Sequence, residues 1–257
     1  FKKLKRSYYS FLILIGAFVF SLFAEFWAGD KPIVMLYQDE IYFPIVFFYP
    51  DDEFGGNYKT EANYFKMRSS GSFQHSDNWM WLPLIPHDPL RSYLNYEENP
   101  PHAPSSNHWL GTDAAGRDLL ARLIHGFRVC MLFAVVVTFL GTIMGVVIGG
   151  GQGFFGGKVD LLMQRGIEVW SQLPFLYVII LIAEIYGRSF WLLILIMCLF
   201  QWVGLSYYMR GEFLKLRQFT FVKSSRALGM SHSHIFFKEI LPNALTPIVT
   251  LVPFSLV

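Results

Sequence analysis

Two short stretches of the chain carry residue types that could do chemistry. The stretch "GQGFFGGKV" at residues 151–159 is rich in glycine and contains a lysine, as phosphate-binding loops do. The pattern G-x-x-x-x-G-K-[ST] would need glycine at Gln152 and serine or threonine at Val159, so this chemistry is excluded. His232 and His234 form an H-x-H pair, but no third metal ligand is evident nearby, so we expect solvated histidines. We predict no catalytic residue, no metal ligand and no bound cofactor in this chain.

A third stretch, "NHWLGTDAAGRDLLARLIHGFRV", begins at residue 107 and holds two acids and an arginine close together. The types of Asp113, Arg117 and Asp118 would allow a catalytic role. We interpret these residues instead as an ion pair and a helix cap, which have a structural role. Thr112 or Asp113 can cap a helix start, because a short side chain carrying oxygen satisfies the free N–H groups of the first turn. Apolar residues at helical spacing follow, at Leu119, Leu120, Leu123, Ile124 and Phe127. The pattern predicts an amphipathic helix on the outer membrane surface, leading into a membrane span.

The composition indicates that these stretches are positioned by membrane-spanning helices. Of 257 residues, 53% are hydrophobic and only 16% are charged, and the mean hydropathy is +0.38. Soluble domains have roughly a quarter charged residues. The formal net charge of +2 is too small to indicate nucleic-acid binding. The two cysteines, Cys130 and Cys198, lie in apolar runs and are interpreted as thiols rather than as a disulfide or zinc framework.

Apolar segments long enough to cross a bilayer recur along the chain. Four are complete and a fifth is cut by the chain end: Tyr8–Trp27, Val129–Gly149, Val169–Tyr186, Ser189–Met209 and Ala244–Val257. We interpret the start at Phe1 and the end within an apolar run as truncation. The first segment follows basic residues, as a signal peptide would, but lacks a small-x-small cleavage site, which favours a retained anchor. Pro174 is expected to kink the third segment.

The distribution of charge predicts the orientation. The segment 29–127 carries thirteen acidic and seven basic residues, whereas the segment 210–242 carries six basic and two acidic residues. The positive-inside tendency therefore places the basic N-terminal tail and residues 210–242 in the cytoplasm, with 29–127 outside. The aromatic-rich residues 29–106 could form either a small lid on the spans or a docking surface for a soluble partner. A short strand is predicted at Ile41–Tyr49.

Glycine recurs at every fourth position in the second span. On a helix these residues, Gly141, Gly145, Gly149 and Gly153, share one face. Small residues on one face let two helices approach closely, so the stripe predicts a packed helix bundle.

The stretch "RALGMSHSHIFFKEILPNA", residues 226–244, lies between two apolar segments. The spacing predicts a helix at 219–228, ended by Gly229 in the left-handed conformation, and a second helix capped by Ser231 or Ser233. Pro242 is expected to end that helix or to start the next span. The apolar side of the second helix would carry Ile235, Phe236, Ile240 and Leu241. Such a small unit cannot bury this side alone, so we expect it to fit a groove in a partner protein.

At this point the chain resembles a known family. "RALG" followed by "ILPN" at this spacing resembles the EAA loop of bacterial ABC-importer permeases, the coupling helix that docks in a cleft of the ATPase subunit. The family pattern opens with Glu-Ala-Ala, whereas this chain has Lys223, Ser224 and Ser225 there. The resemblance implies that coupling involves these three residues together with Arg226, Ala227, Leu228, Gly229, Ile240, Leu241 and Pro242. Asn243 also matches the family pattern.

Other motifs agree with that resemblance. "WLGTDAAGRDLLARLIHG" is similar to a run of the dipeptide and oligopeptide permease branch, and "GFFGGKVD" followed by "LPF" also fits this branch. The stretch "DKPIVMLYQDEIYFPIVFFYPDDEFGG" resembles the Yej-type importer permeases, which extends the match to nearly the whole chain. The periplasmic motif residues so singled out are Gly111, Thr112, Asp113, Gly116, Arg117 and Asp118.

The resemblance implies an all-α membrane protein with the type I ABC importer transmembrane fold. The family has six spans, of which about five fall in this chain, with an extracytoplasmic segment between spans 1 and 2. The expected organisation is a transmembrane helix at 1–28, a periplasmic segment at 29–128 that ends in an amphipathic helix, and a permease core at 129–257 with a cytoplasmic coupling loop at 210–242.

The implied function is that of a multi-pass permease subunit in the bacterial inner membrane. It would pair with a second permease subunit, two ATPase domains that bind ATP and magnesium, and a periplasmic peptide-binding protein. The Yej-type family imports oligopeptides and the peptide-nucleotide antibiotic microcin C. The alternatives are a permease for another small solute or a membrane assembly subunit without a transport role. An exporter subunit would lack both motifs, and a membrane enzyme would need a polar catalytic cluster that the sequence does not present.

Overall fold

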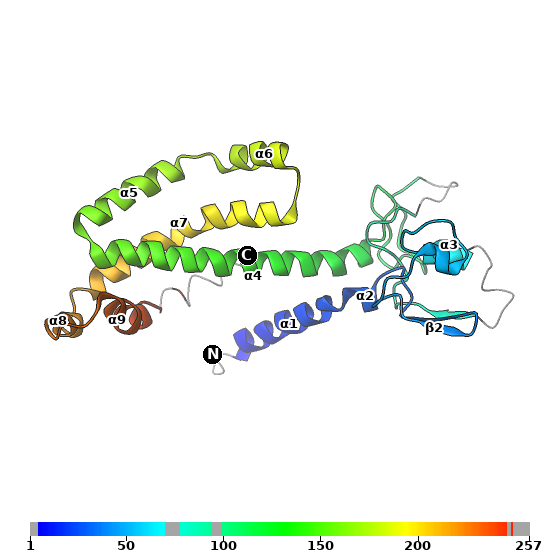
Figure 1. Cartoon of the computed structure of the whole chain (residues 1–257), viewed down its shortest axis with the longest axis horizontal. Helices are drawn as coiled ribbons and strands as arrows, with labels where there is room; N and C mark the ends of the chain where they lie inside the picture. Colours follow the sequence, from blue (N-terminus) through cyan, green and yellow to red (C-terminus); the bar gives the residue numbers. More distant parts are fainter. Residues whose placement is uncertain (1–4, 70–77, 94–98, 246–247, 249–257) are drawn as a thin grey trace. The chain divides into compact units, whose positions relative to one another are not determined.

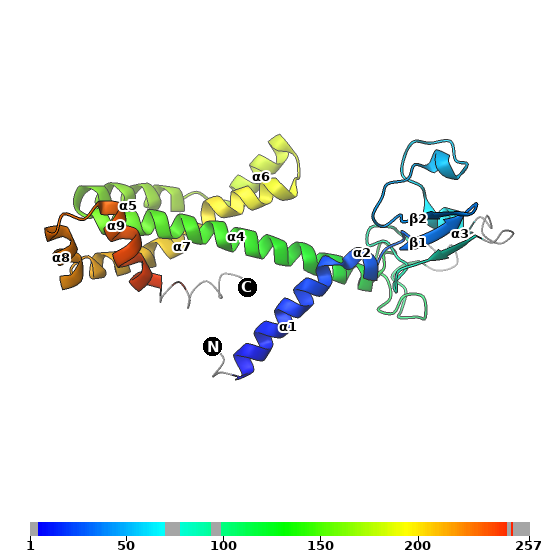
Figure 2. The same cartoon turned by 60° about the horizontal axis from the view of Figure 1, so that its bottom comes forward.

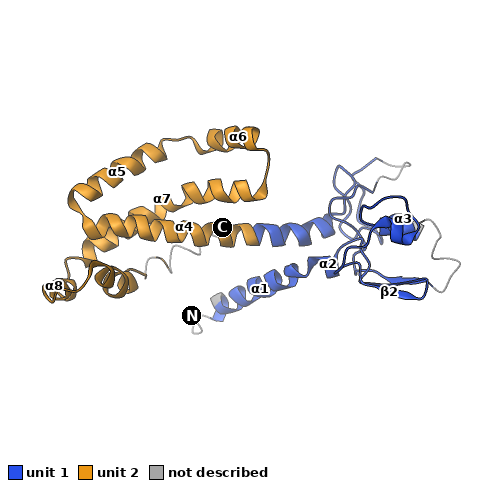
Figure 3. Ribbon diagram, in the orientation of Figure 1, with its two compact units in different colours: residues 1–131 blue, residues 132–257 orange. Residues whose placement is uncertain are grey.

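The computed structural model describes residues 5–69, 78–93, 99–245 and 248 (Figures 1 and 2). The chain divides into two compact units, residues 1–131 and residues 132–257, with the boundary inside one long helix (Figure 3). Each unit has clusters of buried apolar side chains of its own.

Unit 1 combines an apolar helix with a small sheet. In chain order its elements before the long helix are α1 (Lys5–Leu22), α2 (Ala24–Trp27), β1 (Val34–Tyr37), β2 (Glu40–Tyr42), the 3₁₀ turn η1 (Asp51–Phe54), α3 (Tyr64–Ser69) and β3 (Trp79–Trp81). The predicted first span, Tyr8–Trp27, is interrupted at Phe23, where α1 has ended and α2 has not begun.

The sheet is antiparallel, with strand order β2-β1-β3. A two-residue turn, Gln38 and Asp39, joins β1 to β2, and both residues have positive φ, as in the turns that match the twist of a hairpin. The predicted strand at Ile41–Tyr49 is wrong beyond Tyr42. Pro44 follows, which has no N–H to donate to a neighbouring strand, and the chain turns there.

Two apolar clusters stabilise unit 1. One packs Met35 of β1 against Ala62 and Tyr64 beneath the sheet. The other joins Ala28 after α2, Ile85 and Ala121 at the start of the long helix. This second cluster therefore packs the start of the long helix, at Ala121, against the segments that contain Ala28 and Ile85.

Unit 2 is helical in its described part. The long helix α4 (Leu119–Phe155) enters it and is followed by α5 (Gly157–Ser171), α6 (Phe175–Tyr186), α7 (Phe190–Leu216), α8 (Thr220–Ala227), α9 (His232–His234) and the π-helical η2 (Ile235–Ile240). The predicted amphipathic helix is not a separate element. Its residues from Leu119 onward form the first turns of α4, because nothing breaks the helix between them and the span.

Fewer helices are long and apolar enough to cross a bilayer than the sequence predicted. Among the described residues, α4 and α7 are long and apolar enough to span. The pair α5 and α6 forms a third span only as a broken one, bent by 70° at the break that contains Pro174. The apolar part of α1, Tyr8–Leu22, is shorter than a bilayer needs. The predicted fifth span, Ala244–Val257, lies almost entirely outside the described residues.

The glycine stripe of α4 faces α7. A Cβ built on Gly141 would lie 3.2 Å from Gln201, and one on Gly145 would lie 2.9 Å from Leu205. On Gly149 it would lie 2.2 Å from the backbone oxygen of Ser206. On Gly153 it would lie 2.6 Å from the backbone oxygen of Arg210. At Gly145 the Cβ would also lie 3.0 Å from the carbonyl oxygen of Trp202. Three of the four glycines therefore abut backbone atoms, which cannot move aside as a side chain can.

Candidate functional site

Residues 220–240, here called the α8–η2 element, form a compact helix–turn–helix. Its first helix ends in a Schellman motif. Gly229 has φ 75°, its N–H donates to the carbonyl of Arg226, and the N–H of Met230 donates to the carbonyl of Ser225. The second helix begins at Ser231, whose Oγ accepts the N–H of His234 at 3.3 Å. Gly229 therefore ends the first helix and Ser231 caps the start of the second, as the residue types predict.

The apolar side of the α8–η2 element is buried within its own unit. Ile235 and Ile240 are fully buried in the largest cluster of unit 2, beside Val222 of α8. Phe236 packs against Phe213 of α7, with ring centroids 4.8 Å apart. The cluster is completed by Phe154, Met209, Leu216, Ala244 and Ile248. The expectation that this side awaits a partner's groove is therefore wrong, because α4 and α7 already cover it.

A π-helical turn precedes Pro242 and lets the helix continue through it. The N–H of Leu241 donates to the carbonyl of Phe236, five residues back. Proline in a helix lacks its own N–H and crowds the carbonyl four residues earlier, and a widened turn relieves both problems. Helical conformation continues to residue 245, so Pro242 neither ends this helix nor begins a new one.

The turn between the two helices of the α8–η2 element can be followed in Figure 2, and exposed side chains lie both at this turn and on the helices beside it. Leu228 has 76% of its surface exposed, and Phe237 has 58%. Of the residues implied in coupling, Ser225 and Ile240 are buried and Leu241 is half-buried. The exposed ones are Lys223, Ser224, Arg226, Ala227, Gly229 and Pro242 together with Leu228.

Basic side chains connect the α8–η2 element to the ends of the long helices. The guanidinium of Arg217, just after α7, donates to the carbonyl of Gly153 at 3.1 Å and satisfies the last turn of α4. Arg226 of α8 lies over the ring of Phe154, 5.5 Å from its centroid. In addition, Arg210 of α7 donates twice to Asp160 of α5, at 2.6 and 2.8 Å. A rigid helical frame therefore supports the exposed turn.

The periplasmic motif residues form a tight turn in unit 1. Gly111 has φ 76°, and a Cβ there would lie 2.4 Å from the carbonyl oxygen of His102. Thr112 pairs with the same residue in both directions: its N–H donates to the carbonyl of His102, and its Oγ1 accepts the N–H of His102. Gly116, with φ 74°, turns the chain back towards the helix.

The acids of this motif satisfy backbone groups and arginines. The carboxylate of Asp113 accepts the N–H groups of Ala115 and Arg117 and pairs with the side chains of Arg117 and Arg122. The Arg117 N–H, above all, lowers the pKa of Asp113 below its ordinary value. The cap of α4 is Asp118, whose Oδ1 accepts the N–H of Ala121 at 2.8 Å. The prediction that Thr112 or Asp113 caps this helix is therefore wrong, because the turn at 113–117 moves the helix start to Leu119.

Sequence reasoning missed two arrangements. It did not pair Asp160 with Arg210, which are 50 residues apart, although charges at the ends of apolar helices are a signal for such pairs. It also did not group His87 with His108 and Asp118, whose ligand atoms lie within 4.8 Å of one another. The H-x-H residues, His232 and His234, do not belong to that cluster.

Comparisons with known proteins agree with these motifs. A family model described as "Binding-protein-dependent transport system inner membrane component" matches residues 130–257. The "Inner membrane ABC transporter permease protein YejE" of Escherichia coli K12 is 38% identical over 258 residues, covering all of this chain and 75% of that protein. The "Peptidoglycan transport system permease protein YejE" of Agrobacterium fabrum is 38% identical over 284 residues, covering all of this chain and 73% of that protein.

A more distant similarity extends to a dipeptide system. The "Dipeptide transport system permease protein DppC" of Bacillus subtilis is 35% identical over 166 residues, covering 65% of this chain and 51% of that protein. The similarity to the two YejE proteins spans both units of the chain. The chain therefore belongs to the binding-protein-dependent family of ABC transporter permeases, multi-pass inner-membrane components with the type I importer fold.

Proposed function

We propose that this chain is one permease subunit of an ATP-driven importer that moves oligopeptides, including peptide-nucleotide antibiotics such as microcin C, across the inner membrane. A second permease subunit pairs with it, and two ATPase domains bind ATP and magnesium. A periplasmic peptide-binding protein delivers the substrate. The N-terminus and residues 210–242 lie in the cytoplasm. The chain itself converts a partner's ATP cycle into alternating access, and it carries out no chemistry.

The exposed turn of the α8–η2 element is the observation that carries the coupling role. Leu228 projects into solvent while the rest of the element is anchored in the apolar cluster beneath it. A leucine that projects from a turn in this way is available to fill an apolar groove of a partner protein. A displacement of this turn would be transmitted to α7, because Phe236 packs against Phe213 of α7. It would also be transmitted from α7 to α4, because Arg217 at the end of α7 donates to the carbonyl of Gly153 in α4.

The charge of the exposed turn suggests what it would meet. Lys223 stands where the family pattern has an acid, and among the described residues its side chain makes no hydrogen bond or ion pair, although its backbone N–H donates to the carbonyl of Phe219. Arg226 is also at the surface. A glutamate at this position would pair with a basic side chain of the ATPase subunit. Because this chain has Lys223 there, we infer that its ATPase subunit carries acidic side chains in the part of the cleft that faces Lys223.

The substrate class rests on the relatives. One is named for peptidoglycan transport and another for dipeptide transport, and the Escherichia coli relative is named only as an ABC transporter permease. Peptidoglycan contains short peptides, so the two relatives that are named for a substrate both point to substrates that contain a peptide. Microcin C, itself a short peptide joined to a nucleotide, falls within this class by the Yej-type resemblance.

A broad apolar surface supports assembly with a second permease. On α5 and α6 the large apolar residues are mostly exposed in the single chain, for example Leu162 at 78% and Tyr186 at 76%. Monomeric soluble proteins rarely expose patches of this size. Lipid and a partner helix would share this surface.

The coupling proposal is tested with Leu228→Ser. Full-length protein is co-expressed with its ATPase subunits and purified, and the ATPase retained is quantified. Burying a leucine contributes about 1.5–3 kcal/mol, so we expect about 10- to 100-fold weaker retention. Leu90→Ser is the matched control, since Leu90 is 77% exposed but lies in the segment expected outside the membrane.

Gly229→Pro provides a second perturbation of the same turn. Proline cannot adopt φ 75° and removes the N–H that closes the Schellman motif, so retention should fall again while membrane insertion persists. The coupling proposal is refuted if wild type retains no ATPase, or if both variants retain it as well as wild type does.

The substrate proposal has a separate test. The full operon set is expressed in a bacterium whose own peptide importers are deleted, and uptake of labelled oligopeptides and sensitivity to microcin C are measured. Uptake that requires the intact Leu228 supports a peptide importer. Robust ATPase retention without uptake of any peptide would instead indicate another small solute, and neither binding nor uptake would indicate an assembly subunit.

A further inference from the structure

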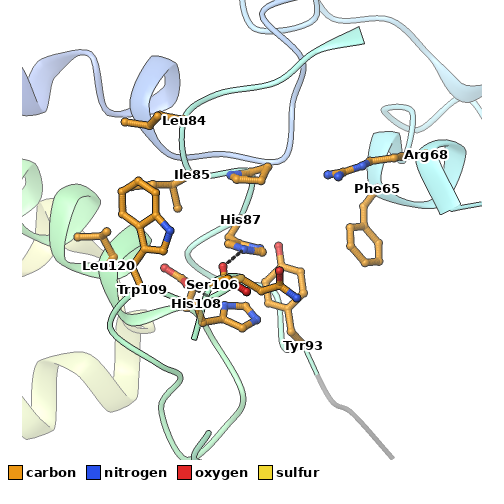
Figure 4. A pocket seen from close by; sticks show the side chains of 13 residues that line it. Phe65, Arg68, Leu84, Ile85, His87, Tyr93, Ser106, His108, Trp109 and Leu120 are labelled. Atoms are coloured by element: carbon orange, nitrogen blue, oxygen red, sulfur yellow. Dashed lines mark hydrogen bonds and ion pairs between the residues drawn. The ribbon is translucent and has the colours of Figure 1, made fainter. Parts of the chain in front are cut away.

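A cavity with mixed apolar and polar walls lies within unit 1. Its volume is about 550 Å³. Its walls are loop residues together with Phe65 and Arg68 of α3 and Leu120 of α4. Figure 4 shows His87, His108, Tyr93 and Trp109 among the loop residues. The cavity is large enough to hold an ion with several waters.

Three potential metal ligands converge at this cavity. One ligand atom from each of His87, His108 and Asp118 lies within 4.8 Å of the others. His108 Nδ1 and Asp118 Oδ2 are 2.8 Å apart, within hydrogen-bond distance. Zinc binds nitrogen and oxygen ligands at about 2.0–2.2 Å, which places ligand pairs roughly 3.3–3.6 Å apart in a tetrahedron. One ligand pair lies 2.8 Å apart and none of the three pairs is more than 4.8 Å apart, so side-chain adjustments of about 1 Å would close the site.

His87 is held as a metal-binding histidine is held. Its Nε2 lies 2.7 Å from the backbone carbonyl of Asn107. A carbonyl only accepts, so Nε2 carries the hydrogen and Nδ1 carries the lone pair. Nδ1 is buried and has no hydrogen-bond partner among the described residues. Metal-ligating histidines typically donate their other ring N–H to a carbonyl or carboxylate, which fixes the tautomer and the ring.

The other two ligands are also fixed before any ion arrives. Asp118 is 1% exposed, and its Oδ1 is committed to the N–H of Ala121, which leaves Oδ2 for the cavity side. The backbone of His108 is tied by its N–H to Ser105 Oγ and by its carbonyl to the N–H of Gly111. Because these ligands are already restrained, binding an ion would cost little side-chain conformational entropy.

We propose that His87, His108 and Asp118 form a binding site for a divalent transition-metal ion of the zinc class. Two imidazoles and one carboxylate suit zinc, cobalt or nickel, whereas magnesium and calcium prefer oxygen ligands alone. A water molecule from the cavity completes the four ligands. The ion takes the place of the hydrogen bond between His108 and Asp118, and the hydrogen of His108 then sits on Nε2, which leaves the Nδ1 lone pair for the ion.

Such an ion would tie three separate pieces of unit 1 together. His87 lies in the segment after β3, His108 lies in the loop before the Gly111 turn, and Asp118 caps α4. An ion would therefore clamp both loops to the first turn of α4. We expect a structural role, since the ligands stabilise loops and one of them caps a helix.

The test uses the full-length permease in nanodiscs, purified through a tag without histidine and stripped with a chelator. Zinc chloride is titrated against a chromophoric zinc chelator, and cobalt chloride is titrated with recording of the visible absorption that reports tetrahedral cobalt. We expect one equivalent bound per chain. His87→Gln and His108→Gln should each weaken zinc binding by about 100-fold and abolish the cobalt absorption.

His125→Gln is the matched control. The Nε2 of His125 also bonds a backbone carbonyl, that of Ala28 at 2.7 Å, but among the described residues His125 belongs to no group of three potential ligands. Thermal unfolding is followed for every variant without metal, and zinc should raise the midpoint of wild type and His125→Gln only. A wild type that binds no zinc, or a His87→Gln variant that folds normally and binds as wild type does, would overturn the proposal.

Discussion

At the residue scale, small residues decide how closely the helices of unit 2 approach. Gly149 and Gly151 lie one turn or less apart on α4, yet their surroundings differ. A Cβ on Gly149 would lie 2.2 Å from the Ser206 backbone oxygen, whereas nothing lies within 4 Å of a Cβ on Gly151. Backbone atoms of α7 cannot rotate away, so the space at Gly149 is fixed by the contact of two main chains.

We therefore predict opposite effects for the same substitution at these positions. Gly149→Ala forces α4 from α7 and should destabilise the protein by about 1–3 kcal/mol. Gly151→Ala should be neutral or stabilise it by about 0.5–1 kcal/mol, because alanine favours a helix. The midpoint of thermal unfolding, read by tryptophan fluorescence in detergent, compares the two. Equal midpoints would mean that the two helices do not pack as described.

At the element scale, an ion pair fastens α5 to α7. The Asp160 side chain is 10% exposed and that of Arg210 is 31% exposed, and two hydrogen bonds join them. A pair sheltered to this extent is screened less than a surface pair, and each partner would be left without its counter-charge if the other were removed. The neighbouring pair of Lys215 with Glu212 is far more exposed and longer, at 3.9 Å.

A double-mutant cycle tests this fastening. Asp160→Asn and Arg210→Met should each lower stability by about 1–3 kcal/mol. The double variant should lose clearly less than the two losses together, because no charge is then left alone. Lys215→Met is the control and should change stability by less than about 0.5 kcal/mol. Strictly additive losses would show that the two side chains do not interact.

At the scale of the whole molecule, the proposed topology assigns opposite sides to two exposed leucines. Leu90 belongs to the acidic segment 29–127 and Leu228 to the basic segment 210–242. Both are about three-quarters exposed, at 77% and 76%, so reagents reach them equally well in the isolated chain. Only the membrane would then distinguish them.

Cysteine labelling measures this assignment. In a Cys130→Ser, Cys198→Ala background without ATPase subunits, Leu90→Cys should react with a membrane-impermeant maleimide in spheroplasts. Leu228→Cys should react only in inverted vesicles. The reverse pattern would invert the orientation, and labelling of both residues from one side would refute the span count.

Much of the candidate site was predictable because its signals are local. Gly229 ends a helix and Ser231 begins one through hydrogen bonds within a few residues, so the types of the residues suffice. The apolar runs likewise predicted α4 and α7, although their ends moved outward. The helix start before α4 was misplaced because Asp113 is taken by the turn at 113–117, and the sequence pattern does not distinguish a turn acid from a capping acid.

By itself, the sequence determined the family, the helical membrane character and the local turn chemistry, because hydropathy, spacing and motif residues act over a few positions. Only the tertiary structure decided which side of the α8–η2 element is buried, since that depends on Phe154 and Phe213 from helices distant in the chain. It likewise paired Asp160 with Arg210 and gathered His87 with His108 and Asp118. Contacts of this kind follow from how the chain folds back on itself, and no local pattern encodes them.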